Sequence, residues 1–309
     1  MLNRRIILGA FAAGLAFSTA AHAADDWKAK YPELTFAVVP TENGTDTLNR
    51  WGPFIDYLSK ELGVKVTMRI AQDYAAVIEG QRAGNIQIAN YGAASYSRAF
   101  ITGVKTEPFA TDKNGDGSDG YYSVFYVLAK SPYQKIEDMK GKNLGLVDPN
   151  STSGNNVPRF ELNKKNIKPE DFFAKVVYTG SHENAVLALA QGSVDVAANQ
   201  WTNDNDSTLQ QMLTKGILKH DDGSVFKKEE FRIINTSSPI LNGPYTVLAD
   251  LPADLKTAVA KAFMDAPVKA KAAYDKIWDG QKLGFTPITH KDYEPTIELV
   301  KFIDSLRKK

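Results

Sequence analysis

The sequence predicts an α/β protein of two lobes, each built on a mainly parallel sheet flanked by helices, with a cleft between the lobes. Two observations carry this prediction. Along the chain, strand-like apolar runs alternate with segments of helical spacing, and such a series occurs twice. The chain has 309 residues, 43% of them hydrophobic, which is enough for two cores.

The first series fills residues 34–102. Apolar patterning predicts strands over residues 34–39, 64–70 and 86–90, and helices over residues 51–62, 74–82 and 94–102. The first helix is followed by Gly63, which is a typical stop signal. Because parallel strands are joined by crossover helices, this order predicts a mainly parallel sheet.

A second series predicts the other lobe. After a buried strand over residues 121–129, the chain is expected to form strands over residues 143–147, 175–178 and 194–198, and helices over 153–166 and 183–191. Crossings near residues 129 and 237 divide the chain into lobe 1 (residues 24–128 plus 238–309) and lobe 2 (residues 129–237). Residues 239–248 would return to lobe 1, where helices over 252–264 and 292–306 would pack.

The N-terminus has the pattern of a cleaved export signal. Arg4 and Arg5 precede an apolar run over residues 6–17, and residues 21–23 match the A-x-A pattern after which leader peptidases cut. Residues 1–23 are therefore predicted to be a signal peptide, and the mature chain would begin at Ala24 and be exported. The arginine pair matches a twin-arginine signal only in part, so the export route stays open.

Composition argues against several classes of function. The formal net charge of +1 provides no basic field for a nucleic acid, the chain has no cysteine, and its four histidines are far apart. We therefore predict no metal, no cofactor and no catalytic residue. Residues 112–117 (DKNGDG) copy the start of an EF-hand loop, but Ser123 stands where that loop needs a glutamate, which favours a polar connection.

The strongest local signal for binding lies in residues 145–154, which end a strand and open a helix. Here Ser151, Thr152 and Ser153 place three hydroxyl groups beside unpaired backbone N–H groups and the positive end of the helix dipole. This combination suits a tetrahedral oxyanion. The structural alternative is that Ser and Thr cap the helix and that the Asp-Pro-Asn segment before them forms a turn.

Three further side chains are candidates for the same site. His182 lies in a loop that enters a helix, where an imidazole can donate to an anion, although a solitary histidine there can equally be exposed or capping. Tyr74 and Tyr121 each follow a turn at a strand edge or helix start, where a phenol can orient a small ligand.

Together these segments resemble the periplasmic phosphonate- and phosphite-binding proteins of ABC importers. The resemblance runs along most of the mature chain and rests on residues 72–75 (QDYA), 90–92 (NYG), 120–123 (GYYS), 148–154 (DPNSTSG), 180–185 (GSHENA) and 194–197 (VDVA). It implies a class II bilobal binding protein that closes on its ligand in the periplasm. It also implies an ABC permease as partner, and the protein is most simply a monomer.

The resemblance also implies a role for individual residues. The hydroxyl groups of residues 151–153 would hold the phosphonate oxygens, joined by Tyr74, Tyr121 and His182. Aminoalkylphosphonate receptors of the family place carboxylates where this chain has Thr202 and Pro244, so an ammonium partner is not secured, although Asp204 or Asp206 could substitute from a loop folded inward. The candidate contacts for the ligand's tail are Tyr91, Trp201, Thr202 and Tyr245.

Three functions follow as hypotheses. The first is a receptor for 2-aminoethylphosphonate, a smaller alkylphosphonate or phosphite. The second is a receptor of the same fold for another oxyanion, such as a sulfonate or nitrate. The third is a periplasmic enzyme that acts on a phosphorus compound, which the lack of catalytic motifs argues against.

Overall fold

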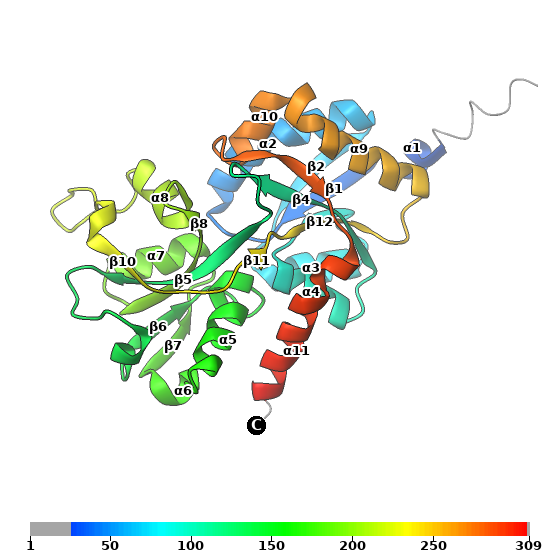
Figure 1. Ribbon diagram of the computed structural model, residues 1–309. Helices are drawn as coiled ribbons and strands as arrows, with labels where there is room; N and C mark the ends of the chain where they lie inside the picture. The colour runs from blue at the N-terminus through cyan, green and yellow to red at the C-terminus, as the bar shows by residue number, and fades with distance from the viewer. Residues whose placement is uncertain (1–25, 308–309) are drawn as a thin grey trace, which may run out of the picture.

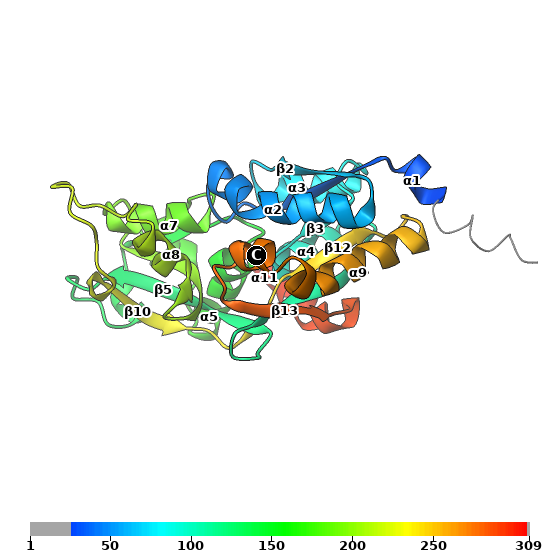
Figure 2. The ribbon, with the colours of Figure 1, turned by 90° about the horizontal axis from the view of Figure 1, so that it is seen from above.

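The computed structural model describes residues 26–307, so the predicted signal peptide at residues 1–23 lies outside the described residues. Two sheets lie beside each other, and helices flank each of them (Figure 1 and Figure 2). This arrangement confirms the predicted bilobal α/β architecture. No helix within residues 26–307 is long and apolar enough to cross a membrane.

The first sheet is built from two distant parts of the chain. Its strand order is β13-β4-β12-β3-β1-β2, with β1 parallel to β2 and β3 and the other pairs antiparallel. The strands are β1 (Glu33–Val38), β2 (Lys65–Ile70), β3 (Ile88–Asn90), β4 (Thr106–Asn114), β12 (Pro244–Leu248) and β13 (Lys282–Pro287). With it we group, as the first lobe, α1 (Asp26–Lys30), α2 (Gly44–Leu62), α3 (Tyr74–Arg82), α4 (Ala93–Ile101), α9 (Ala253–Lys269) and α10 (Lys271–Ile277).

The second sheet has the same plan. Its order is β10-β5-β8-β6-β7, with β6 parallel to β7 and β8, while β5 is antiparallel to β8 and β10. The strands are β5 (Gly120–Leu128), β6 (Asn143–Leu146), β7 (Lys175–Tyr178), β8 (Val196–Asn203) and β10 (Phe231–Thr236), with short β9 (Asp206–Ser207) and β11 (Ile240–Leu241) at the margin. The second lobe adds α5 (Val157–Lys164), α6 (Pro169–Phe172), α7 (His182–Ala190) and α8 (Thr208–Thr214).

Helix starts follow local capping chemistry. Helix α3 begins at Tyr74 because the Asp73 side chain accepts the backbone N–H of Ala76 at 2.7 Å. Helix α2 begins at Gly44 rather than at the predicted residue 51, because the Asn43 side chain accepts the N–H of Asp46 at 3.0 Å. The polar first turns of α2 lack the apolar periodicity from which its start was predicted.

The predicted lobe boundaries differ from the sheet pairing at two places. Predicted lobe 1 runs to residue 128, but β5 pairs with β8 and β10 in the second sheet, so the chain changes sheets between Asn114 and Gly120. It returns after β11, which still pairs with β5, and before Pro244, the first residue of β12. The apolar composition of β5 indicates a central strand but not which sheet it joins.

Apolar packing joins the two lobes as well as filling each one. One buried cluster fills the first lobe around Trp51, Phe54 and Phe263, and another fills the second lobe around Phe125 and Leu144. A third buried cluster contains residues of both lobes. The last helix, α11 (Glu294–Arg307), packs on α4 of the first lobe, as predicted, and also touches α5 of the second (Figure 1).

Candidate anion-binding site

A cavity of about 160 Å³ lies between the lobes. Segments of both lobes line it, and they include the ends of parallel strands, where ligands bind in open α/β sheets. All six side chains predicted to hold the anion line this cavity: Tyr74, Tyr121, Ser151, Thr152, Ser153 and His182. The structure therefore brings them to one place, although they come from four separate segments of the sequence.

The three hydroxyl residues form a buried tip where β6 leads toward α5. Thr152–Asn156 is a π-helical turn, and the Ser151 side chain caps it by accepting the N–H of Gly154 at 3.0 Å. Gly154 is needed here, because a Cβ at this position would lie 2.3 Å from the Cβ of Val147. Ser151 therefore caps the turn, as the structural alternative predicts, and it also lines the cleft, while its role in anion binding stays a prediction. We call residues 151–153 the hydroxyl tip.

Two phenol groups adjoin the hydroxyl tip. Tyr74 begins α3 in the first lobe and Tyr121 lies on β5 in the second, so they approach the tip from the two sides of the cleft. Burial raises the pKa of both, and hydrogen bonding with the tip's side chains acts against that rise. Both phenols are consequently protonated at neutral pH and can donate to an anion without carrying charge.

His182, at the start of α7, presents an acceptor to the cleft. Its Nδ1 lies 3.1 Å from Asn199 Oδ1, an oxygen that also accepts the backbone N–H of Gln200 at 2.9 Å, while Asn199 Nδ2 donates to the His182 carbonyl at 2.9 Å. Asn199 Oδ1 is thus an acceptor, and the ring proton must reside on Nδ1.

The other ring nitrogen carries a lone pair. Burial lowers the pKa of His182 to about 4, so the imidazole is neutral near pH 7. Nε2, which is 3.5 Å from Ser151 Oγ, is then an acceptor, whereas the position of His182 in the sequence predicts a ring that donates. The hydroxyl tip, the two phenols and His182 thus offer this part of the cavity hydroxyl donors, one imidazole acceptor and no charged group of their own.

The structure shows the lobes in contact around the cavity. Thr152 Oγ1 of the second lobe accepts the N–H of Ala94 in the first lobe at 2.9 Å, and Glu183 Oε2 accepts the N–H of Asn43 at 3.0 Å. Gly92 permits this approach, because a Cβ there would lie 2.9 Å from Thr152 Oγ1. This is a closed arrangement of the two lobes.

A lysine joins carboxylates of the two lobes. Lys215 Nζ lies 2.6 Å from Asp46 Oδ2, 3.3 Å from Glu42 Oε2 and 3.4 Å from Glu183 Oε1. The three carboxylates are close enough together to suit a metal ion, yet in this geometry the ammonium group already neutralises part of their charge. We therefore assign this cluster to lobe contact.

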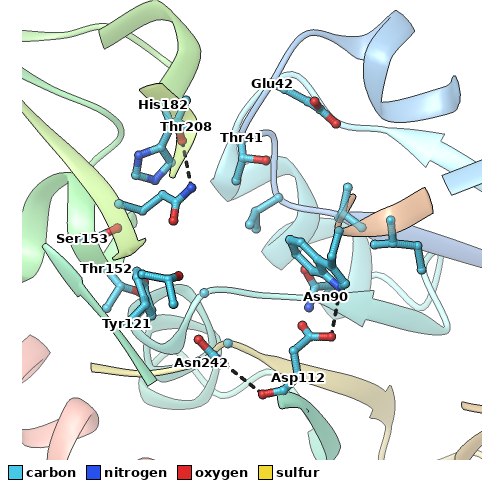
Figure 3. A pocket seen from close by; sticks show the side chains of 18 of the residues that line it. Thr41, Glu42, Asn90, Asp112, Tyr121, Thr152, Ser153, His182, Thr208 and Asn242 are labelled. Carbon is cyan, nitrogen blue, oxygen red and sulfur yellow. Dashed lines mark hydrogen bonds between the residues drawn. The ribbon is translucent and has the colours of Figure 1, made fainter. Parts of the chain in front are cut away.

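The far end of the cavity carries acids and a lysine. Figure 3 shows Asp112 and Asn90 across the cleft from Ser153, Thr152 and Tyr121. Trp278 Nε1 donates to Asp112 Oδ1 at 3.0 Å, and the Tyr245 hydroxyl donates to the same carboxylate at 3.1 Å. Burial raises the pKa of Asp112 to about 7, against the effect of Lys282 and these hydrogen bonds.

Lys282 belongs to this far end. Its Nζ is 2.8 Å from Asp206 Oδ2 and 2.6 Å from Asn114 Oδ1, and both Lys282 and Asp206 line the cavity. We use "far end" for the group formed by Asp112, Asp206, Trp278 and Lys282.

Of the four residues predicted to contact the ligand's tail, two line the cavity and two do not. Thr202 lines the cavity, and so does Tyr91, although its hydroxyl donates to the Val77 carbonyl at 3.3 Å. Trp201 does not line it, because its ring packs on Tyr122, and its neighbour Thr202 faces the cavity instead.

The prediction that Tyr245 contacts the ligand's tail is also wrong, because Tyr245 does not line the cavity. It is fully buried in the aromatic core of the first lobe and reaches the site only through its hydrogen bond to Asp112. The prediction missed Asp112, Trp278 and Lys282, and it named Asp206 only as a conditional substitute. Asp112 lies in the EF-hand-like segment, whose polar sequence predicts an exposed connection. The fold buries its side chain instead.

Comparison with known proteins places these features in a family. A model described as "ABC transporter, phosphonate, periplasmic substrate-binding protein" matches residues 36–293. The phosphonates-binding periplasmic protein of Escherichia coli (strain K12) is 37% identical over 211 residues, which cover 65% of this chain and 60% of that protein.

Two further proteins match over most of their length. The phosphate-import protein PhnD of Mycolicibacterium smegmatis is 31% identical over 283 residues, covering 85% of this chain and 84% of that protein. The crystal structure of a binding protein component of an ABC phosphonate transporter from Pseudomonas aeruginosa has a TM-score of 0.76 and 26% identity, covering 88% of this chain and 86% of that one.

Proposed function

The chain belongs to the family of periplasmic substrate-binding proteins of phosphonate ABC transporters, and from this premise we propose that it captures a small phosphonate between its lobes and delivers it to an ABC permease. The site of this action is the periplasm. The ligand is 2-aminoethylphosphonate, a smaller alkylphosphonate or phosphite. The second candidate is orthophosphate, because the mycobacterial relative is named as a phosphate importer.

The single observation that carries this proposal is the hydroxyl tip with its two phenols and His182. A tetrahedral oxyanion needs several hydrogen bonds from different directions, and these six side chains converge on one cavity from both lobes. Because the donors are uncharged, selectivity comes from the geometry and number of hydrogen bonds rather than from bulk positive charge. Each polar group left without a partner in a desolvated site costs about 1–3 kcal/mol.

Closure couples binding to delivery. An anion held by the second lobe's hydroxyl tip would gain Tyr74 only when the first lobe closes over it, so the ligand binds the closed form more tightly than the open form. The permease is then presented with one shape of the receptor. A receptor that hinges and docks in this way acts as a monomer.

Isothermal titration with methylphosphonate, 2-aminoethylphosphonate, phosphite, phosphate and nitrate tests the proposal. We expect saturable 1:1 binding of at least one phosphonate or phosphite with micromolar or lower Kd. A folded protein that binds none of the phosphorus compounds would refute it. Release of inorganic phosphate from a bound phosphonate would instead indicate an enzyme.

Thr152→Ala is expected to weaken phosphonate binding by about 10–150-fold, because one charge-assisted hydrogen bond of about 1.5–3 kcal/mol is lost. The measurement is titration with the tightest ligand of the panel. Thr257→Ala is the matched control, since the Thr257 hydroxyl donates to the Ala253 carbonyl on the exposed face of α9. Equal affinity of Thr152→Ala and wild type would remove Thr152 from the site.

Gly92→Ala is expected to oppose closure. The new methyl group would press on Thr152 Oγ1, and overpacking of this kind costs about 1–3 kcal/mol, so the Kd should rise by roughly tenfold. Small-angle scattering of the liganded variant should show a larger radius of gyration than liganded wild type. Gly52→Ala is the control, because a Cβ at Gly52 meets nothing within 4 Å. Unchanged affinity and radius in Gly92→Ala would contradict the closed geometry.

A further inference from the structure

Lys282 and Asp206 form a buried ion pair between the lobes. Lys282 begins β13 of the first lobe, Asp206 begins β9 of the second, and their side chains are only 6% and 8% exposed. The ammonium group also donates to Asn114 Oδ1 and lies 5.7 Å from the Trp278 ring. Because both charges are buried, removing one partner leaves the other charge buried and without compensation.

The charges of the cavity are unevenly distributed. The hydroxyl tip has no charged side chain, and His182 beside it is neutral. The far end holds two acids, Asp112 and Asp206, and one ammonium group, that of Lys282. Arg50, the other cationic side chain among the described residues of the cavity wall, is paired at 3.0 Å with Glu42 and with Asp279 of its own lobe.

Four acids line the cavity, and Lys215 already contacts two of them, Glu42 and Glu183. The far end, with Asp112 and Asp206, is therefore where a ligand ammonium would find an acid. A phosphonate seated on the hydroxyl tip extends its tail across the cleft toward the side where Figure 3 places Asp112. Lys282 already pairs with Asp206 there, and its charge also acts on Asp112. A second ammonium group would have to share these acids with Lys282 in a desolvated space, where like charges repel.

We infer that the ammonium group of Lys282 takes the place of a ligand ammonium at the far end, so that the receptor selects phosphorus oxyanions with a short uncharged tail and disfavours ω-aminoalkyl tails. This inference rests on the proposed function and narrows its ligand class. Lys282 is thus a specificity-determining residue that no motif of the sequence indicates. It also couples selection to closure, because its partner Asp206 lies in the opposite lobe.

The test compares two ligands of nearly equal shape. 2-Aminoethylphosphonate and propylphosphonate differ in carrying a terminal ammonium or methyl group, so the ratio of their Kd values isolates the effect of the charge. In wild type we expect 2-aminoethylphosphonate to bind at least tenfold more weakly than propylphosphonate. In Lys282→Met, which keeps the apolar stem, the ligand's ammonium can pair with Asp206, and we expect the ratio to fall by at least tenfold and reverse.

Lys113→Met is the control, because Lys113 is an exposed lysine on neighbouring β4 and should leave the ratio at its wild-type value. The inference is overturned if wild type binds 2-aminoethylphosphonate as tightly as propylphosphonate or more tightly, or if Lys282→Met leaves the ratio unchanged. Should Lys282→Met fail to fold, the wild-type ratio alone decides. If wild type binds methylphosphonate but one of these two ratios differs from the expected value, only this inference is refuted. If folded wild type binds no phosphorus oxyanion, the proposed function is refuted as well.

Discussion

Methanesulfonate is expected to bind at least 100-fold more weakly than methylphosphonate, although the two ions have nearly the same shape. The difference lies in one proton. A methylphosphonate monoanion carries a P–OH group, whereas a sulfonate has three unprotonated oxygens. His182 Nε2 presents a lone pair to the site, because Asn199 Oδ1 holds the ring proton on Nδ1. A P–OH group can donate to that lone pair, and a sulfonate oxygen can only repel it.

The size of the effect follows from the missing hydrogen bond. The lost charge-assisted hydrogen bond contributes about 1.5–3 kcal/mol, and the repulsion between the lone pair of Nε2 and a sulfonate oxygen acts in the same direction. Competition titration with the two ligands measures the difference. His182→Gln provides an amide N–H donor in place of the fixed acceptor, and it should reduce the discrimination to less than tenfold. Binding of methanesulfonate by wild type within tenfold of methylphosphonate would contradict this role.

The same role sets the pH dependence of binding. The pKa of His182 is lowered to about 4, so the imidazole supplies no proton at neutral pH, and the proton between Nε2 and the ligand must come from P–OH. Above the second pKa of methylphosphonate, binding then requires uptake of a proton from solvent. We expect the Kd to rise about tenfold per pH unit in that range in wild type, and more gently in His182→Gln.

The hydroxyl tip could be predicted from sequence because its signals are local. Ser151, Thr152 and Ser153 are consecutive, and the preferences that mark them, helix capping and turn formation, act over a few residues. The same is true of Asp73 before Tyr74, which fixes the start of α3. Repeated apolar periodicity likewise gave the parallel parts of both sheets.

The far end could not be predicted because it exists only in the folded chain. Asp112, Asp206 and Lys282 lie on three strands that are far apart in sequence, and β4 and β13 lack the alternating apolar pattern of a strand. Polar residues in such segments suggest exposure until the fold buries them. The predictions for Trp201 and Tyr245 were wrong for a simpler reason. Neighbouring residues of a strand point to opposite faces, and the sequence does not say which face borders the cleft.

Asp112→Asn is expected to stabilise the protein at pH 8 and to lose this advantage at low pH. The pKa of Asp112 is raised from 3.8 to about 7 by burial, so the folded state binds a proton more tightly than the unfolded state. The stabilising effect of that proton is complete below pH 3.8 and is lost as pH rises toward 7. Asparagine cannot ionise and avoids the loss, which approaches about 4 kcal/mol at about 1.4 kcal/mol per pKa unit.

The groups that surround Asp112 explain why its ionised form is so poorly supported. Tyr245 and Trp278 donate to it, but Tyr274 and Tyr293 of neighbouring elements are buried and uncharged, and the charge of Lys282 is shared with Asp206. Asparagine keeps an oxygen that can accept from Tyr245 and Trp278, so the substitution removes charge with little change in shape.

Denaturant unfolding of wild type and variant between pH 4 and pH 9 measures the difference in unfolding free energy. The control is Asp116→Asn, an exposed acid in the connection between β4 and β5 whose pKa is lowered by hydrogen bonds from Ser118, so its loss should not stabilise the protein at any pH in this range. A difference for Asp112→Asn that does not grow between pH 4 and pH 7 would show that Asp112 is not forced to ionise at a cost. Because Asp112 also lines the cavity, its ionisation would change the charge that a bound ligand meets as well as the stability of the fold.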